Sequence, residues 1–408
     1  MCCRALDAVK YMLCTVVLQS RGKSNMNLST IEQLMQRKVQ PPMPMGSYDP
    51  SDAVFLLKDL SNVNLEKETG EREHAIQSGV HYSEMLPVEY HPTDEYIALF
   101  HHTLAQSASK VALAAATVAE CIMHKKGPRP VLVSLARAGT PIGILVKRFI
   151  KMKYGTDLPH YSISIIRGKG IDQNAILYIL QQHGVDAKLQ FIDGWTGKGA
   201  IRQVLIEACR DFEKRYGVRL DDDLAVLADP GQCSSTYGTR EDFLIPSACL
   251  NSTVSGLMSR TVLRDDLIGP DDFHGAKWYK EWEASDLSQL FVDTISGCFP
   301  DVAEAASQQA KELLHHLPEV TWQGKKDIEA IQRAFGIKDI NMVKPGIGET
   351  TRVLLRRVPW KILVNHQDNP HLEHIRLLAK ERGVPVEVFP GLTYSCCGII
   401  RSIKGGGE

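Results

Sequence analysis

The sequence predicts a mixed α/β protein in which a domain built on a mostly parallel sheet is followed by a smaller α/β domain. Between residues 130 and 228, short strand-like segments rich in β-branched residues alternate with longer segments of helical periodicity. That alternation is typical of βαβ units and a parallel sheet. A second alternation of helix and strand begins near residue 340, and 408 residues are enough for two or three domains.

The elements of the first domain follow in a regular order. A long helix rich in Ala and Leu is expected over residues 93–124, before the sheet begins. Strands are expected at 130–135, 161–166, 188–192 and 224–228, with helices over 142–154, 173–183 and 200–216. Open α/β sheets bind ligands at the carboxyl ends of their strands. We therefore expect the loops 136–141, 167–172 and 193–199 to converge on one site.

The remaining boundaries follow from changes in composition. We expect an N-terminal extension or linker over residues 1–46, the sheet domain over 47–300, a helical connector over 301–339 and the small domain over 340–408. The extension is polar, rich in Met and contains Pro41-Pro42, which favours a linker. In the small domain, helices are expected over 350–356 and 372–382, and strands over 360–364 and 385–389.

Composition excludes several classes of function. The net charge of −1 gives no overall attraction to nucleic acid or to an anionic membrane, so a nucleic-acid site has to be a local basic patch. The ten cysteines form no C-x-x-C pair, which excludes a zinc ribbon and a thioredoxin motif. The apolar run over residues 11–18 is too short to span a bilayer. We expect a cytoplasmic protein with reduced thiols, no metal cluster of its own and no membrane partner.

A glycine-rich loop, Asp193-Gly194-Trp195-Thr196-Gly197-Lys198-Gly199, follows the third predicted strand and precedes a helix. Glycines let backbone N–H groups approach an anion, and the helix N-terminus adds a favourable dipole. Thr196 can donate a hydroxyl hydrogen bond, and Lys198 supplies positive charge. The spacing of a Walker A loop is missing. The sequence therefore predicts a phosphate-binding loop, and the alternative is a tight turn that needs its glycines for geometry alone.

The order of strand, Asp, Thr-Gly-Lys-Gly and helix resembles the phosphoribosyl pyrophosphate loop of type I phosphoribosyltransferases. From about residue 47 to 300, the chain resembles the phosphoribosyltransferase-like domain found in bacterial stress and tellurite-resistance gene neighbourhoods. The same family is also catalogued under the label StiP, a cysteine protease. The strings that carry the resemblance are SLARAGTPIG, FIDGWTGKG, FLIPSACLNSTVSGLMSRTVL and DFHGAKWY.

The resemblance implies a type I phosphoribosyltransferase-like fold and an enzyme that displaces pyrophosphate from ribose C1, making a nucleoside-like metabolite in a stress response. Asp193 would hold the ribose, and Arg137 and Lys169 would stabilise the leaving pyrophosphate. The implied phosphate contacts are Thr196, Gly197, Lys198, Gly199, Gly139 and Thr140. Mg²⁺ would accompany phosphoribosyl pyrophosphate, and a homodimer is a further expectation. The usual loop has further acids that this one lacks, which leaves an inactive nucleotide-binding module as an alternative.

A cysteine protease is the other alternative for the same domain. Such an enzyme needs a thiolate beside a His. Cys249 and Cys233 are the candidate nucleophiles and His274 is the candidate base, with His81 and His160 as further bases. No local signature of a known protease family surrounds either cysteine, and a cysteine in an apolar segment is more often a buried packing residue.

A glycine turn followed by a basic helix distinguishes the small domain. Such a turn offers backbone donors, and nearby guanidinium groups add phosphate contacts. Residues 340–403 resemble the Pelota-type branch of the L7Ae RNA-binding domains, in which a Gly-x-x-Glu turn and a basic helix grip kinked RNA. The resemblance implies RNA as a partner; the alternative is an N-capped helix with solvated arginines. The implied contacts are Lys344, Gly346, Gly348, Glu349, Arg352, Arg356 and Arg357.

Overall fold

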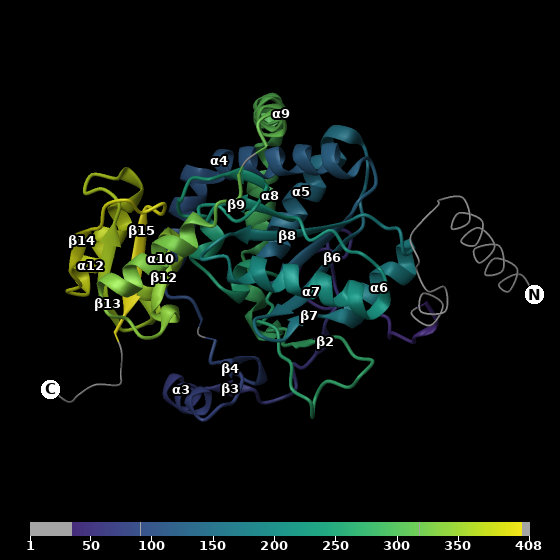
Figure 1. The fold of residues 1–408 in the computed structure, drawn as a ribbon, viewed down its shortest axis with the longest axis horizontal. Helices are drawn as coiled ribbons and strands as arrows, with labels where there is room; N and C mark the ends of the chain where they lie inside the picture. Colours follow the sequence, from purple (N-terminus) through teal and green to yellow (C-terminus); the bar gives the residue numbers. More distant parts are fainter. Residues whose placement is uncertain (1–34, 90, 318, 402–408) are drawn as a thin grey trace, which may run out of the picture.

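The computed structural model describes residues 35–89, 91–317 and 319–401, and it contains a parallel sheet domain with a small domain beside it (Figure 1). The central sheet has the strand order β1-β6-β5-β8-β9-β10, and every neighbouring pair in that order is parallel. Its strands are β1 (Val54–Phe55), β5 (Val131–Ala136), β6 (His160–Ile166), β8 (Leu189–Trp195), β9 (Leu224–Ala228) and β10 (Thr236–Thr239). The predicted mixed α/β fold with a parallel core is confirmed.

Helices cover both faces of this sheet (Figure 1). One face carries α4 (Asp94–Lys126), α5 (Gly139–Tyr154), α8 (Ser288–Gly297) and α9 (Phe299–His315). The other face carries α6 (Gln173–His183) and α7 (Ala200–Tyr216). Helix α4 is rich in buried alanines, including Ala112, Ala115 and Ala119. Small side chains let helices approach closely, so α4 can pack against both the sheet and α9.

Short elements complete the sheet domain. Antiparallel strand β7 (Gly170–Ile171) returns along the end of β6, so the predicted loop 167–172 is a tight hairpin. The other short elements are β2 (Lys58–Asp59), β3 (Glu66–Lys67), α3 (Thr69–Gln77), η1 (Tyr82–Glu84), β4 (Leu86–Pro87), η2 (Pro246–Ala248), η3 (Ser252–Val254), β11 (Gly275–Ala276) and η4 (Lys280–Ser285).

The C-terminal domain has its own four-stranded mixed sheet, in the order β12-β15-β13-β14. Its elements are α10 (Gln323–Ala334), η5 (Ile340–Met342), β12 (Val343–Pro345), α11 (Ile347–Arg356), β13 (Pro359–Val364), η6 (Pro370–Leu372), α12 (Glu373–Glu381), β14 (Val386–Val388) and β15 (Cys396–Ile400). Ile328 and Ile331 of α10 share a core with Tyr394 and Leu363. The predicted helical connector is therefore divided, because α9 packs on α4 and α10 belongs to the C-terminal domain.

The predicted N-terminal extension is only partly covered by the described residues. Residues 1–34 of the predicted extension lie outside them, whereas Met45 is already buried in the core of the sheet domain. Within the described ranges, none of the helices combines the length and the apolar character that crossing a bilayer requires.

Candidate functional site

The carboxyl ends of β8 and β9 meet the C-terminal domain at one edge of the sheet. Strand β8 continues three residues beyond its predicted end, to Trp195, and Thr196 N donates to Ala228 O at 3.0 Å. Gly199 then takes a left-handed conformation (φ +81°) directly before α7, which few residues other than glycine adopt at no cost. The predicted glycine loop therefore lies where expected, between a strand and the N-terminus of a helix.

A buried hydrogen-bond network lies behind this loop. The carboxylate of Asp229, which directly follows β9, is fully buried. It accepts hydrogen bonds from the Thr196 hydroxyl (2.7 Å), Cys233 N (3.0 Å) and Ser234 N (3.3 Å). Burial raises the pKa of Asp229, and the bonds from Thr196 and the two backbone N–H groups oppose that rise. Thr196 also accepts from Gly231 N at 3.0 Å, so its hydroxyl is held in one position.

The thiol of Cys233 belongs to the same network. Burial and the nearby Asp229 charge raise the pKa of this thiol to about 12, while the neighbouring Thr196 hydroxyl and Arg202 oppose that rise. The thiol of Cys233, the hydroxyl of Thr196 and the carboxylate of Asp229 therefore follow one another in space. Cys233 is nevertheless only 1% exposed, and its Sγ lies beside Gly199.

A cavity of about 280 Å³ opens in front of this network, between the sheet domain and the C-terminal domain. Both domains supply its walls, with Cys233 among the lining residues. The others are Arg167, Asp193, Trp195, Thr196, Gly197, Lys198, Gly199, Ala200, Ile201, Arg202, Leu224, Val343, Lys344, Pro345 and Glu349.

Positive side chains predominate among the charged residues of this cavity. Lys198 Nζ contacts Asn341 Oδ1 at 2.8 Å, and its pKa is lowered to about 8 by burial and by the charges of Lys344 and Arg167. Burial likewise lowers the pKa of Lys344. Arg202 pairs through Nη2 with Asp222 at 2.7 Å, while its Nη1 is buried and has no partner among the described residues. The cavity is therefore suited to a group that carries negative charge or accepts hydrogen bonds.

Asp193 is the acidic residue of the loop that lines the cavity. Burial raises its pKa to about 7, opposed by the hydrogen bond that Gly194 N donates at 2.8 Å. Glu349 on the opposite wall pairs with Arg352 at 3.0 Å, and Asp229 is occupied by its three hydrogen-bond donors and by Arg240 at 3.6 Å. Within the described part of the chain, no cluster of three or more His, Cys, Asp or Glu side chains could hold a metal ion. The carboxylates present do not fit a protein-held Mg²⁺ site, and the Mg²⁺ expectation stays a prediction.

The other predicted phosphoribosyl contacts are placed apart from this cavity. Arg137 donates to Met258 O at 2.7 Å and lies 3.7 Å from Glu89, so it ties two loops together. Lys169 is exposed on the β6–β7 hairpin. Thr140 is buried and bonded to Ser162 at 2.7 Å, and a side chain at Gly139 would collide with Ile192 O. Of the three loops expected to converge, 193–199 lines the cavity and 167–172 contributes Arg167.

The candidate bases for a thiol lie in separate networks. His274 bonds through Nδ1 to Ser164 at 2.9 Å, and its backbone N donates to Asp172 at 2.6 Å. Burial lowers the pKa of His274, and Asp172 opposes that shift. His160 lies in the core between Ser134 and Asp52, and His81 bonds to Ser83. The structure therefore does not place His274 in the Cys233 network.

Cys249 lies within the main apolar core, where it is only 1% exposed. It immediately follows η2, whose own residues pack against α4. This setting fits a packing role, so of the two predicted thiols Cys233 is the one that reaches a cavity.

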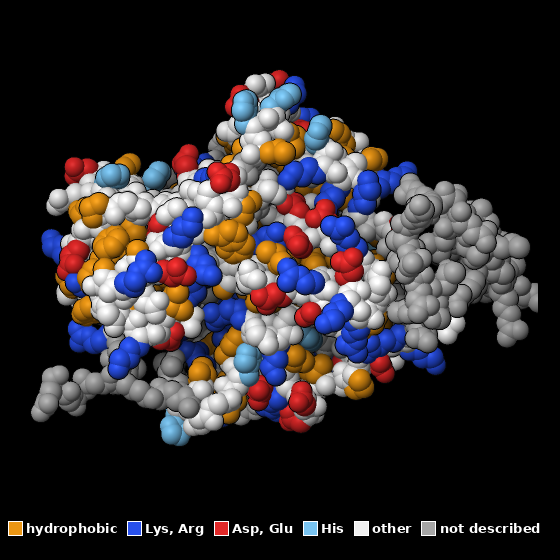
Figure 2. Space-filling model, viewed as in Figure 1, with side chains coloured by type: hydrophobic (Ala, Val, Ile, Leu, Met, Phe, Trp, Pro, Cys, Tyr) orange, Lys and Arg blue, Asp and Glu red, His pale blue; other side chains and the backbone are white. Residues whose placement is uncertain are grey.

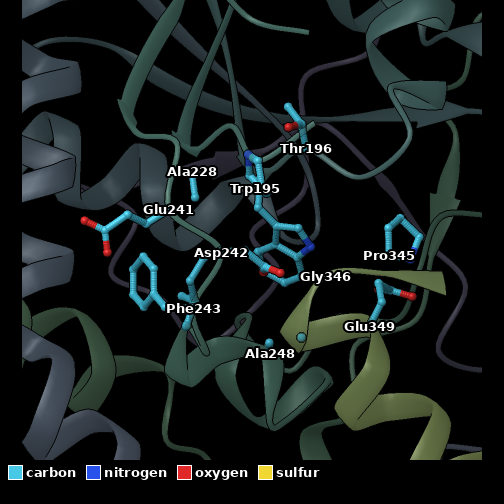
Figure 3. A pocket seen from close by; sticks show the side chains of 13 residues that line it. Trp195, Thr196, Ala228, Glu241, Asp242, Phe243, Ala248, Pro345, Gly346 and Glu349 are labelled. Carbon is cyan, nitrogen blue, oxygen red and sulfur yellow. The ribbon is translucent and has the colours of Figure 1, made fainter. Parts of the chain in front are cut away.

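The glycine turn predicted to bind RNA is docked against the sheet domain. Asp242 is half-buried and points at the start of α11 beside Gly346 (Figure 3). It accepts from Ile347 N at 3.0 Å and from Ser395 N at 2.8 Å. Arg352 donates to Ala248 O at 3.2 Å and lies over the ring of Trp195.

Two other predicted RNA contacts are not enclosed by the interface between the domains. Lys344 lines the cavity, and Arg357 is exposed at the end of α11. The side chain of Arg356 lies outside the described residues. The glycine turn therefore faces the sheet domain, whereas Lys344 lines the cavity and Arg357 is exposed to solvent.

Three further hydrogen bonds join the domains around the Cys233 loop. Tyr394 donates to Gly197 O at 3.1 Å, Trp322 N donates to Gln232 O at 3.0 Å, and Gly324 N donates to Gly231 O at 3.1 Å.

Some residues of this site were not predicted as functional from the sequence. Asp229 was placed only as the residue that follows the fourth predicted strand. Nothing local in the sequence indicated that Arg202 and Asp242 belong to the site, because their roles depend on contacts with distant segments.

Two family models match different parts of this chain. Residues 46–296 match the family described as the tellurite-like stress resistance cysteine protease StiP. Residues 322–402 match the PELOTA RNA binding domain, which begins earlier than predicted because it includes α10. Cysteine protease StiP of Acinetobacter baylyi is 34% identical over 355 residues, covering 84% of this chain and 90% of that protein.

These matches correct the prediction of a phosphoribosyltransferase, which is wrong. Both the family model and the relative that cover the sheet domain are cysteine proteases, the stated alternative. The glycine loop misled the interpretation because its Thr196 hydroxyl is directed at Asp229. The predicted Pelota-type domain is confirmed.

Proposed function

This chain belongs to the StiP family, and on that premise we propose that it is a cysteine protease whose nucleophile is Cys233. The observation that carries the proposal is the position of Cys233 on the wall of an open cavity, where its backbone N and the Thr196 hydroxyl both donate to the buried carboxylate of Asp229. Cysteine proteases need a nucleophilic sulfur with a base within reach and a third group that holds the base. Here Asp229 is the base, and Thr196 lies between it and the thiol and relays the proton.

The thiol is protonated at neutral pH, because its pKa is raised to about 12 by burial. Attack on a peptide carbonyl therefore has to include loss of that proton. The thiol proton passes to the Thr196 oxygen while the Thr196 proton passes to Asp229 along their 2.7 Å hydrogen bond. Because burial raises the pKa of Asp229, its carboxylate is a stronger base than an exposed one.

The remaining steps follow from that transfer. The sulfur bonds to the carbonyl carbon, and the tetrahedral oxyanion then collapses as the C–N bond breaks. The leaving amine takes the proton from Asp229 through Thr196, and water hydrolyses the resulting thioester. Arg202 supports the oxyanion stage, because its Nη1 is buried at the cavity with no partner in the described part of the chain and its charge lowers the pKa of Cys233.

The position of the cavity determines how a substrate enters. Cys233 is buried and lines the cavity between the two domains, so a peptide reaches it through that cavity. An extended segment fits such an entrance better than a folded domain. We therefore infer that the substrates are flexible or unfolded chain segments.

We also infer that the C-terminal domain binds RNA. The inference is supported by the PELOTA match over residues 322–402 and by the cationic residues Lys344 and Arg357 at the edge of the docked turn. Together with the family description, this suggests a protease of a stress response whose activity is linked to RNA.

A labelling experiment tests the assignment of the nucleophile. The native protein is treated with iodoacetamide, digested and mapped by mass spectrometry, and its cleavage of a proteome-derived peptide library is measured in parallel. Because iodoacetamide reacts with the thiolate, the labelling is followed as the pH is raised. Cys233 is expected to be alkylated with loss of cleavage, whereas Cys249→Ala should leave both unchanged. Loss of cleavage without modification of Cys233 would refute the assignment.

A further inference from the structure

We propose that the cavity between the domains is a second RNA contact, in which Lys198 and Arg167 of the sheet domain hold a backbone phosphate together with Lys344 of the C-terminal domain. The proposal rests on the proposed RNA binding by the C-terminal domain. It adds residues of the protease domain to that interface, and it places RNA in the same cavity as Cys233.

Three cations from separate segments converge on this cavity. Lys198 lies in the glycine loop, Arg167 at the β6–β7 hairpin and Lys344 in β12. Arg167 is held by Tyr82, whose hydroxyl accepts from Arg167 N at 2.8 Å and whose ring lies 5.2 Å from the guanidinium. On the face seen in Figure 2, Lys and Arg side chains gather along the boundary between the two domains.

The nearby carboxylates neutralise this cluster only in part, because Asp339 and Glu349 both act on Lys344 but Glu349 is shared with Arg352. Burial acts to raise the pKa of Glu349, but Arg352 and Lys344 lower it overall, and its 3.0 Å partner is Arg352. Asp193 is only partly ionised at neutral pH, because its pKa is about 7. Like charges kept close in a partly buried space are costly unless an anion joins them.

The geometry favours an RNA backbone over a free small anion. Asp242 already occupies the N–H groups at the start of α11, so RNA that approaches the docked turn meets Lys344 and the cavity instead. About 280 Å³ accommodates one nucleotide unit but no folded RNA. A strand that crosses the boundary can place a single phosphate there while the rest remains on the C-terminal domain.

RNA and a peptide substrate would compete for this cavity. Lys198 and Cys233 line the same cavity, so an RNA strand that fills it excludes a peptide from the thiol. RNA should therefore act as a competitive inhibitor of peptide cleavage.

The first test measures RNA affinity. Binding of a fluorescein-labelled RNA hairpin, with a kinked internal loop and a single-stranded tail, is followed by anisotropy at several salt concentrations. Lys198→Ala should weaken binding about tenfold and lower the salt slope by about 0.7, as expected for one lost phosphate contact. Lys214→Ala, which removes an exposed lysine from α7, is the matched control and should change neither value. Equal slopes for Lys198→Ala and Lys214→Ala would overturn the proposal.

The second test follows protection of Cys233 from iodoacetamide. The RNA hairpin should slow alkylation of Cys233 in the wild type and not in Lys198→Ala, while AMP at the same nucleotide concentration should give no protection. Equal protection by AMP would make the cavity a mononucleotide site and contradict the proposal. So would a gain of RNA affinity on Asp242→Ala, because it would mean that RNA binds only when the domains separate. Cleavage that survives Cys233→Ser would refute the proposed nucleophile and leave the affinity test intact.

Discussion

The hydroxyl of Thr196 donates a 2.7 Å hydrogen bond to the buried carboxylate of Asp229, from a loop that has the sequence of a phosphate cradle. A hydroxyl aimed at a carboxylate is not available to a ligand phosphate. The same bond connects the glycine loop after β8 to the segment after β9, where Cys233 lies. The chemistry of the site therefore depends on the junction between two neighbouring strands.

Thr196→Val keeps the size of the side chain and removes its hydroxyl. Without it, Cys233 has no route for its proton and Gly231 N loses its acceptor. We expect peptide cleavage to fall about a hundredfold or more, with a loss of about 1–3 kcal/mol in the free energy of unfolding. Thr196→Ser should restore cleavage, since it returns the oxygen. Full cleavage by Thr196→Val would exclude the relay.

Raising the pH should weaken RNA binding. Lys198 has a pKa of about 8, lowered by burial, Lys344 and Arg167 and raised by Asp339. It is charged below that value and loses its proton as the pH rises through it, so its attraction for a phosphate is lost on the alkaline side. A bound phosphate stabilises the charged form and moves the midpoint upward. Lys198→Arg should remove this step from the anisotropy titration, and an unchanged step would show that another group titrates.

Asp242→Ala should loosen the docking of the C-terminal domain. The carboxylate accepts from Ile347 N at 3.0 Å and from Ser395 N at 2.8 Å, and both donors lie in the other domain. Bonds to a charged acceptor contribute about 1.5–3 kcal/mol each, so urea unfolding should shift by several kcal/mol. Glu373→Ala, an exposed carboxylate on α12, is the control and should change little. A small effect of Asp242→Ala would mean that other contacts hold the domains together.

Gly139→Ala should destabilise the sheet domain. A Cβ at this position would meet the backbone carbonyl oxygen of Ile192, which cannot move aside cheaply. We expect a cost of about 1–3 kcal/mol in chemical denaturation. Gly70→Ala is the matched control, because nothing lies within 4 Å of its Cβ and alanine favours its helix. A neutral Gly139→Ala would indicate that the loop after β5 is free to shift.

The sequence predicted those parts of the structure that depend on local pattern. The strands β5, β6, β8 and β9 were visible as β-branched segments between amphipathic helices, and the glycine loop was found in its correct place. Strand β15 was not predicted, because Cys396–Ile400 gains its strand character from pairing with β12 and β13.

Fewer residues of the candidate site could be predicted from the sequence. Asp229 becomes part of it only through donors that lie up to 33 positions away, and Arg202 through the cavity that the C-terminal domain closes. His274 was predicted as a base from its residue type, yet the fold commits it to Ser164 and Asp172. The inward orientation of the glycine turn at Gly346 also could not be predicted, since its partner Asp242 precedes Ile347 by 105 positions.

The central claim is that Cys233 is the nucleophile of a cysteine protease, and peptide cleavage by matched cysteine variants tests it most directly. A proteome-derived peptide library is incubated with wild type, Cys233→Ser and Cys249→Ser, and new peptide ends are counted by mass spectrometry. We predict cleavage by wild type and Cys249→Ser, and loss of cleavage in Cys233→Ser with its unfolding midpoint preserved. Cleavage by Cys233→Ser at the wild-type rate, or none by the wild type, would contradict the claim.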